Sequence, residues 1–188
     1  MNYFIKEKDW KHIFEVLGFR QDIRSKQELK LRVFIEAVWY VARTGCQWHL
    51  LPSPYGHWRS IHRRFKRWAE KSVWDYLFQT VQSDSDTEIM MIDATIVRAH
   101  SCSAGYKKES QAEQALGRSK GGFTTKIHAL VDALGNPIKF ILTPGQRNEI
   151  TQAKSLIQDI RHSTLLADKR YDSLGFINTV ENKSCIPI

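Results

Sequence analysis

The first 82 residues repeat apolar side chains every three or four positions, which is the spacing of amphipathic helices. Ser25 and Glu28 fit a capping box that opens the second repeat, and Gly18 and Gly45 mark the ends of the first two. The pattern predicts helices over residues 6–17, 25–44, 57–71 and 72–81. We therefore expect an all-helical domain over residues 1–82.

Beyond a polar linker at residues 83–88, the pattern becomes strand-like. Apolar stretches predict a strand in MMIDATIVRAH, a hairpin around LGNP, a short strand in STLLA and a final strand at the chain end. Helices are predicted on both sides of the STLLA strand, over residues 151–160 with Ile157 and Ile160 inward, and over residues 173–181. Residues 101–122 are polar and predict a long loop. This order of strand, hairpin, helix, strand, helix and strand is that of an RNase H-like domain, here over residues 89–188. The predicted fold class is α+β, with an all-helical domain before an RNase H-like α/β domain.

Two acidic residues belong to these predicted strands. Asp93 interrupts the apolar run MMIDATIV, which predicts a buried strand around its carboxylate, and Asp168 follows STLLA. In an RNase H-like sheet the first and fourth strands are parallel neighbours, so these carboxylates would meet and repel unless a divalent cation lies between them. We therefore predict a two-metal site for Mg²⁺ or Mn²⁺ at Asp93 and Asp168, the usual apparatus for cutting phosphodiesters. The alternative is that Asp93 caps a loop or pairs with a neighbouring Arg.

Three other residues near these motifs have simpler explanations. Asp132 falls in the predicted hairpin, where turn formation accounts for it. Glu149 precedes a predicted helix, where an acid favours the helix dipole, although a role as a metal ligand stays open. His100 could orient a phosphate or a water, or have no special role in its loop.

Positive charge is concentrated in the first half of the chain. Residues 1–82 hold 15 Lys and Arg against 8 Asp and Glu, whereas residues 83–188 hold 13 against 12. A basic module before a near-neutral one indicates polyanion binding. The third predicted helix carries five cations, and four more lie in the predicted long loop. The helix cations are Arg59, Arg63, Arg64, Lys66 and Arg67, and the loop cations are Lys107, Lys108, Arg118 and Lys120.

We interpret this basic helix as the recognition helix of a variant helix-turn-helix unit that binds double-stranded DNA. Its Arg side chains would reach phosphates and guanine edges, while the loop cations would contact the DNA backbone. The alternative is a basic helix that only confers solubility. The turn before the helix is long for a strict helix-turn-helix, so we expect a variant geometry.

Composition leaves little support for other classes of protein. The chain has no apolar run of transmembrane length and no apolar N-terminal signal, so a cytoplasmic location away from membranes is expected. Its three cysteines are widely spaced and odd in number, which argues against a disulfide framework. A zinc site from His100, Cys102 and His128 is conceivable, but no paired ligand spacing supports it.

Several of these motifs together resemble the insertion-sequence DDE transposases of family five, in the wider family-four-like group. DATIVRAH around Asp93, GRSKGGFTTKIHALVDALGNPIKFILTPGQ and LADKRYDS around Asp168 resemble the catalytic motifs, and RTGCQWHLLP followed by HWRSIHRRFKRW resembles the DNA-binding region. The resemblance implies a Mg²⁺-dependent Asp-Asp-Glu triad that cleaves and transfers DNA at terminal inverted repeats, in a bacterial nucleoid-associated protein compatible with a homodimer. By position, Asp93 is the first acid and Asp168 the second.

The chain departs from this family in two places. Arg170 stands where the family usually has Gly, so its side chain is expected to crowd the site. The family's third acid lies on a later helix in a Tyr-Arg-Glu signature, and neither Asp172 nor Glu181 corresponds to it. We therefore expect an incomplete RNase H-like domain that lacks its C-terminal part, in a frameshift product or a truncated transposase. The alternatives are a non-catalytic DNA-binding repressor or competitor of transposition, and a decayed remnant that scarcely folds.

Overall fold

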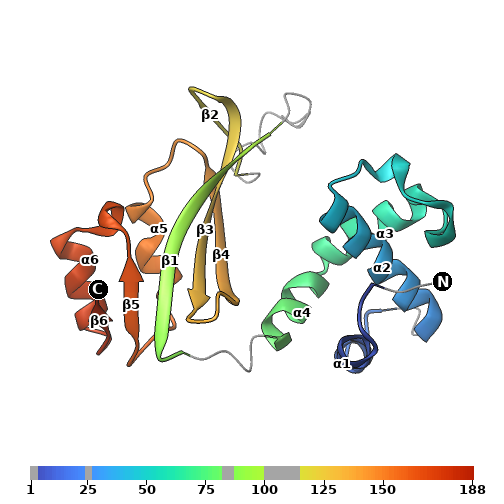
Figure 1. Cartoon of the computed structure of the whole chain (residues 1–188), viewed down its shortest axis with the longest axis horizontal. Helices are drawn as coiled ribbons and strands as arrows, with labels where there is room; N and C mark the ends of the chain where they lie inside the picture. Colours follow the sequence, from blue (N-terminus) through green and yellow to red (C-terminus); the bar gives the residue numbers. More distant parts are fainter. Residues whose placement is uncertain (1–3, 24–26, 82–86, 100–114) are drawn as a thin grey trace. The chain divides into compact units, whose positions relative to one another are not determined.

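The computed structural model of the chain describes residues 4–23, 27–81, 87–99 and 115–188 (Figure 1). Contacts divide the chain into two compact units, residues 1–83 and 84–188, and each has its own hydrophobic core. Helices make up the first unit, and a six-stranded sheet with helices makes up the second. Within the described residues, no helix has the length and apolar character needed to cross a membrane.

Four α-helices and two 3₁₀ turns build the described part of the first unit. They are α1 (Glu7–Gly18), α2 (Glu28–Thr44), η1 (Trp48–Leu50), η2 (Ser53–Tyr55), α3 (Trp58–Glu70) and α4 (Val73–Val81). The helices pack through large aromatic side chains, because Trp10, Phe34 and Trp68 come from three different helices and are buried in one cluster. The rings of Phe34 and Trp68 meet edge to face, with centroids 4.8 Å apart. The four predicted helices are therefore present.

The start of α2 differs from the prediction. Gln27 is the N-cap residue and makes no side-chain cap bond, while Ser25 lies outside the described residues. The carboxylate of Glu28 instead accepts a hydrogen bond from Nε1 of Trp10 at 3.0 Å. The predicted capping box is therefore wrong, because Glu28 is the first residue of α2 after the N-cap Gln27 and not the third residue of the helix. The predicted stop at Gly45 is confirmed, since this residue caps α2 with a left-handed φ of 66°.

The second unit contains a mixed sheet. Its strands are β1 (Ile89–Arg98), β2 (Gly117–Ser119), β3 (Gly122–Asp132), β4 (Pro137–Pro144), β5 (Thr164–Ala167) and β6 (Ile186–Pro187). The strand order is β2-β3-β1-β5-β6, and β4 pairs with β3. Strand β3 runs antiparallel to both β1 and β4, whereas β1, β5 and β6 are parallel neighbours. The expectation that the first and fourth predicted strands, β1 and β5, lie side by side and parallel is confirmed.

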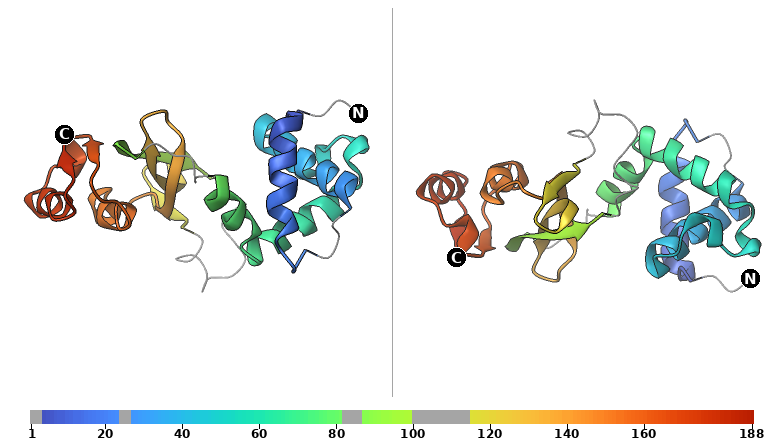
Figure 2. Two further views of the ribbon diagram at one scale, coloured as in Figure 1. Left: turned by 90° about the horizontal axis from the view of Figure 1, so that it is seen from below. Right: turned by 90° about the horizontal axis from the view of Figure 1, so that it is seen from above.

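Two helices cover one face of this sheet. Helices α5 (Ile150–Leu156) and α6 (Leu174–Glu181) lie on the same side in both views of Figure 2. Their buried side chains form one core with Ile92 of β1, Leu130 of β3 and Leu165 of β5. On the opposite face, Phe140 and Leu142 of β4 remain 49% and 56% exposed. The structure thus confirms a mixed α/β architecture in which one sheet face is covered and the other is open among the described residues.

Two predicted boundaries in this unit were wrong. The predicted loop over residues 101–122 contains β2, which pairs antiparallel with the start of β3, and residues 100–114 lie outside the described part. Polar side chains concealed this pairing, because a strand of three residues has too few positions to show an alternation. The helix expected near residues 151–160 ends at Leu156, although Ile157 and Ile160 beyond it are buried as expected.

Candidate functional site

Asp93 and Asp168 lie at the same level of two neighbouring parallel strands. Ile92 of β1 pairs with Ala167 of β5. Asp93 directly follows Ile92, and Asp168 directly follows Ala167. Asp93 is exposed rather than enclosed in a strand core, so the expected burial of this carboxylate was wrong. Its position on the open face removes the large desolvation cost that burial would impose. Its Oδ1 accepts a hydrogen bond from the backbone N–H of Ala94 at 2.7 Å.

Asp168 is held at its position by the turn that follows β5. Residues Lys169–Tyr171 form a 3₁₀ turn, η6, and Asp168 is its N-cap residue. The Oδ1 atom of Asp168 accepts a hydrogen bond from the backbone N–H of Arg170 at 2.8 Å. The side chain is half exposed, which leaves carboxylate oxygen available beside Asp93. Strand and turn together therefore fix the direction of this carboxylate.

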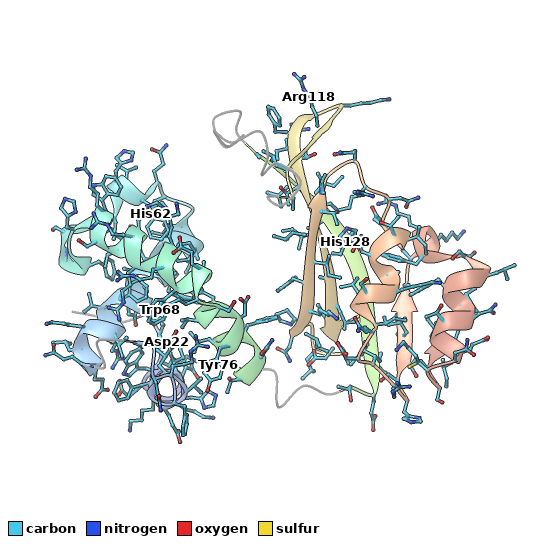
Figure 3. All side chains as sticks on the ribbon, turned by 180° about the vertical axis from the view of Figure 1, so that it is seen from behind. Asp22, His62, Trp68, Tyr76, Arg118 and His128 are labelled. Atoms are coloured by element: carbon cyan, nitrogen blue, oxygen red, sulfur yellow. The ribbon has the colours of Figure 1, made fainter. Side chains whose placement is uncertain are left out.

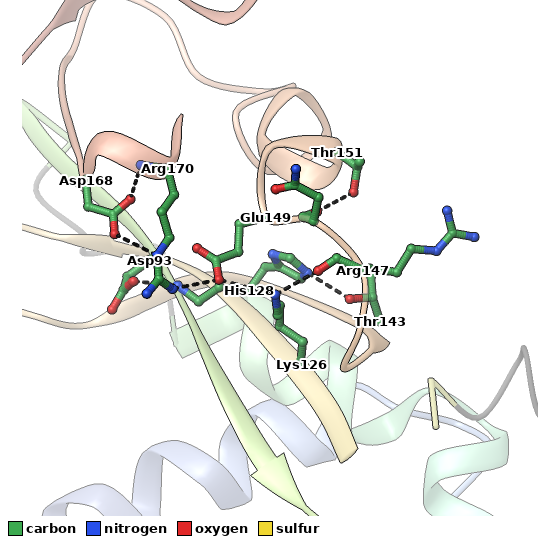
Figure 4. A network of polar contacts seen from close by, with 11 residues as sticks. Asp93, Lys126, His128, Thr143, Arg147, Glu149, Thr151, Asp168 and Arg170 are labelled. Carbon is green, nitrogen blue, oxygen red and sulfur yellow. Dashed lines mark hydrogen bonds and ion pairs between the residues drawn. The ribbon is translucent and has the colours of Figure 1, made fainter. Parts of the chain in front are cut away.

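Arg170 extends its side chain from this turn between the carboxylates (Figure 4). Its NH1 donates a hydrogen bond to Oε1 of Glu149 at 2.9 Å, and its Nε lies 3.8 Å from Oδ2 of Asp168. The hydrogen bond with Glu149 and the negative charges of Glu149, Asp168 and Asp93 raise the pKa of the Arg170 guanidinium. The predicted crowding at this position thus takes the form of a cation among three acids.

Glu149 and Lys126 form a buried ion pair behind the aspartates. Glu149 is 5% exposed and Lys126 is 6% exposed, and Nζ of Lys126 lies 3.2 Å from Oε1 of Glu149. Nζ also donates to the backbone carbonyl of Arg147 at 2.7 Å. Within the described residues, Oε2 of Glu149 is buried and has no hydrogen-bond partner. Glu149 occupies the N-cap position of α5 but makes no side-chain cap bond, so the ion pair explains the residue better than the predicted dipole effect.

Two more buried polar side chains, His128 and Tyr171, lie near the Glu149–Lys126 ion pair. Nε2 of His128 lies 2.9 Å from Oγ1 of Thr143, and burial together with the charge of Lys126 lowers the pKa of the His128 imidazole. Burial also raises the pKa of the Tyr171 hydroxyl, and the negative charges of Glu149 and the aspartates add to this effect. In both side chains burial disfavours the charged form.

The structure tests the predicted turn role of Asp132 but does not describe two residues of the zinc site that was considered. Asp132 accepts backbone hydrogen bonds from Leu134 and Asn136 in the turn of the hairpin, which confirms its predicted turn role. His100 and Cys102 of the conceivable zinc site lie outside the described residues. In the part of the chain that the structure describes, no group of three or more His, Cys, Asp or Glu side chains is placed to hold a metal ion.

The basic helix α3 presents part of its positive charge to solvent. Arg59, Arg63, Lys66 and Arg67 are exposed. Arg64 is only partly exposed, because its guanidinium packs over the Phe34 ring at 4.4 Å and the Trp68 ring at 5.3 Å. Burial and the charge of Arg67 lower the pKa of Arg64. Four of the five predicted DNA-contacting residues of this helix are thus available to a ligand, and Arg64 also contributes to packing.

Aromatic contacts also support the side of α3 that faces the preceding turn. The Trp48 ring of η1 lies 5.1 Å from His62 and 5.2 Å from Phe65, measured between centroids. His62 and Trp68 both project from α3 (Figure 3). In the second unit, Arg118 extends from the β2–β3 hairpin and stacks 5.7 Å from the Phe123 ring, and Lys120 is exposed. The predicted contacts Lys107 and Lys108 lie outside the described residues.

Sequence reasoning missed Lys126 as a member of this site. A signal was present, because Lys126 and His128 alternate with Ile127 and Ala129 along the predicted strand. An alternating strand places one of these two sets inward, but the rule favours burial of the apolar set. The structure buries the polar set, with Glu149 neutralising Lys126 and Thr143 bonding His128.

Comparisons with known proteins cover both units of the chain. Residues 84–188 match the family described as "Transposase DDE domain", and residues 5–78 match the family described as "Putative transposase of IS4/5 family". No solved structure matches the chain significantly.

Two curated relatives are similar to parts of the chain. The uncharacterized protein y4sN of Sinorhizobium fredii is 40% identical over 77 residues, which cover 41% of this chain and 62% of the relative. The "Putative transposase for insertion sequence element IS6501" of Brucella ovis is 41% identical over 51 residues, which cover 27% and 39% of the two chains. Each match spans less than two thirds of the relative. Because the DDE-domain match covers more than half of the chain, this protein belongs to the insertion-sequence transposases with a DDE domain.

Proposed function

We propose that the chain acts on double-stranded DNA as a DDE transposase that binds terminal inverted repeats and contributes to metal-dependent strand cleavage and transfer. The observation that carries the proposal is that Asp93 and Asp168 directly follow Ile92 and Ala167, which are paired residues of the parallel strands β1 and β5. Members of this family generally use divalent metal ions. Under the proposal, the second unit is an RNase H-like domain and these two residues are the first two acids of its triad.

The chemistry of the two carboxylates fits a hard divalent cation. Both provide exposed oxygen atoms, the kind of ligand that Mg²⁺ and Mn²⁺ prefer. A cation bound there would supply the positive charge that activates an attacking hydroxyl and stabilises a leaving oxygen. Asp93 and Asp168 would hold it, and the strand pairing and the η6 turn would orient their side chains. No group of three candidate metal ligands lies among the described residues, so a triad requires a third acid beyond this pair.

The proposed DNA-binding surface is the exposed side of α3, in a variant helix-turn-helix formed with α2. Arg59, Arg63, Lys66 and Arg67 supply four cations to phosphates or base edges. The turn between the helices contains η1 and η2, which is longer than a three- to four-residue turn and agrees with a variant geometry. Arg64, packed against Phe34 and Trp68, supports the helix from below.

A second candidate function is a non-catalytic DNA-binding protein that represses or competes with transposition. The exposed cations Arg59, Arg63, Lys66 and Arg67 on α3 favour it, because binding to phosphates through them needs no metal site. Under this alternative the basic helix α3 still binds DNA, while Asp93 and Asp168 have no reaction to perform.

Nicking of supercoiled plasmid in the presence of Mn²⁺ distinguishes the two candidates. The transposase proposal predicts nicking that needs the metal and that Asp93→Asn and Asp168→Asn each reduce by at least about a hundredfold. Asp172→Asn is the matched control, because this exposed carboxylate follows the same turn and has no proposed role. Nicking that both substitutions leave intact would contradict the proposal, and DNA binding without nicking would favour the second candidate.

A further inference from the structure

We propose that Arg170 is a built-in counter-cation of the Asp93–Asp168 pair, which a divalent metal ion must displace in order to bind. The inference rests on the proposed metal site and concerns its regulation. Its basis is the position of the Arg170 guanidinium among three carboxylates (Figure 4). The consequence is a site whose metal affinity is lowered by a residue of the same chain.

A backbone hydrogen bond holds Arg170 next to Asp168, so its side chain begins beside the proposed metal site. Its N–H donates to Oδ1 of Asp168 at 2.8 Å, so the residue and the carboxylate are joined at the start of η6. The side chain then turns back, with Nε 3.8 Å from Oδ2 of Asp168 and NH1 bonded to Oε1 of Glu149. Both carboxylate oxygens of Asp168 thus face one residue, through its backbone and its guanidinium.

Arg170, and not Lys126, is placed to compensate the negative charge of Asp168. Lys126 is buried, and its ammonium group is held by Glu149 and the carbonyl of Arg147. Among the ion pairs of the described residues, Arg170 is the cation placed against Asp168. Two neighbouring carboxylates without a cation repel each other, and Arg170 relieves this repulsion when no metal is bound.

Arg170 can leave without stranding a buried charge. Its side chain is 67% exposed, so solvent can receive the guanidinium after it moves. Glu149 keeps its ion pair with Lys126 when Arg170 departs. The Arg170–Asp168 contact is long and exposed on both sides and is therefore weak, whereas a divalent ion has twice the charge and binds carboxylate oxygen directly. The metal ion therefore displaces Arg170 from the carboxylates, but it binds with lower affinity than it would if Arg170 were absent.

Isothermal titration of the full chain with Mn²⁺ tests this competition. We expect Arg170→Ala to bind Mn²⁺ roughly tenfold more tightly than the wild type, since one opposing charge close to the site is removed. Arg170→Lys, which keeps the charge, should stay within about threefold of the wild type. Lys169→Ala is the matched control, because it removes the same charge from the same turn without an ion pair to Asp168 or Glu149, and it should change the affinity less than about twofold.

A metal-free measurement tests the same role independently. In EDTA, Arg170→Ala should lower the Tm of the second unit by roughly 2–5 °C, and adding Asp93→Asn should recover part of this loss because the repulsion disappears. Equal Mn²⁺ affinity in the wild type and Arg170→Ala would overturn the counter-cation while the metal site stands. Absence of Asp93-dependent Mn²⁺ binding in every variant would overturn the metal site and this inference together.

Discussion

Asp93 and Asp168 follow directly after a paired couple of residues on two parallel strands, although they are far apart in the sequence. This relationship places the two aspartates beside each other, Asp93 in β1 and Asp168 at the turn that follows β5. The guanidinium of Arg170 lies next to Asp168 there and compensates its negative charge. The parallel pairing of β1 with β5 creates the site, and the η6 turn sets the direction of its second acid. The proposed metal site therefore depends on sheet topology more than on any continuous motif.

The exposed cations of α3 should contribute to DNA affinity through counterion release. Combining Arg63→Ala with Lys66→Ala should weaken binding to a fluorescent random-sequence duplex of about 30 base pairs and lower the slope of log Kd against log salt by about 2. Lys8→Ala with Lys11→Ala is the matched control, because it removes two exposed cations from α1 of the same unit. Identical salt slopes for the two double variants would remove α3 from the interface.

Arg64 should matter for folding because of its packing. Arg64→Ala removes contacts with the rings of Phe34 and Trp68 and should lower the free energy of unfolding by about 1–2 kcal/mol. All six tryptophans lie in residues 1–82, so Trp fluorescence during urea unfolding reports on this unit. The exposed neighbour Arg63→Ala should change stability by less than about 0.5 kcal/mol. Equal losses in both variants would show that Arg64 has no special packing role.

The buried ion pair behind the aspartates should be important for stability. Lys126→Met leaves Glu149 buried with one exposed partner and should destabilise the second unit by about 3–5 kcal/mol in calorimetry. Lys139→Met breaks an exposed pair with Asp159 and should cost less than about 1 kcal/mol. A small loss for Lys126→Met would indicate that the pair is not closed to solvent.

His128 should make the second unit sensitive to mild acid. Its pKa is lowered in the folded state from an ordinary value of 6.5, mainly by burial, so the unfolded chain binds the proton more readily. The stability that the neutral imidazole contributes is therefore present above pH 6.5 and is lost as the pH falls through this value toward the folded pKa. Between pH 7.5 and 5.5, the Tm should fall by roughly 3–6 °C more in the wild type than in His128→Asn.

His162 is exposed, so the substitution His162→Gln is the control for this pH effect. This variant should retain the pH dependence of the wild type. Differential scanning calorimetry at both pH values gives the Tm of each variant. An unchanged pH dependence in His128→Asn would assign the effect to other groups.

The order of strands and helices was sufficient to predict that β1 and β5 are parallel neighbours, because few sheet topologies permit that order. The exposure of Asp93 could not be predicted in the same way. Apolar residues occupy both sides of this position along the strand, so the pattern suggests burial on both faces. The open face became visible only when both α5 and α6 were located on the other side of the sheet.

The contact between Arg170 and Glu149 was also beyond sequence reasoning. Local context explains Glu149 as a helix-start acid, and nothing in the chain near it indicates a partner in the η6 turn. The same limit applies to Glu28, whose local pattern suggests a capping box although its carboxylate bonds Trp10 of another helix. Short-range rules identify the elements, but long-range contacts decide which polar group satisfies another.

Mn²⁺ binding by the full metal-free chain tests the central claim most directly. Isothermal titration should give a site whose Kd is raised at least about tenfold by Asp93→Asn and by Asp168→Asn, since each removes a charged oxygen ligand. Asp172→Asn, an exposed carboxylate at the end of the same turn, should bind Mn²⁺ as the wild type does. Mn²⁺ affinity that is the same in all four proteins would contradict a metal site at Asp93 and Asp168.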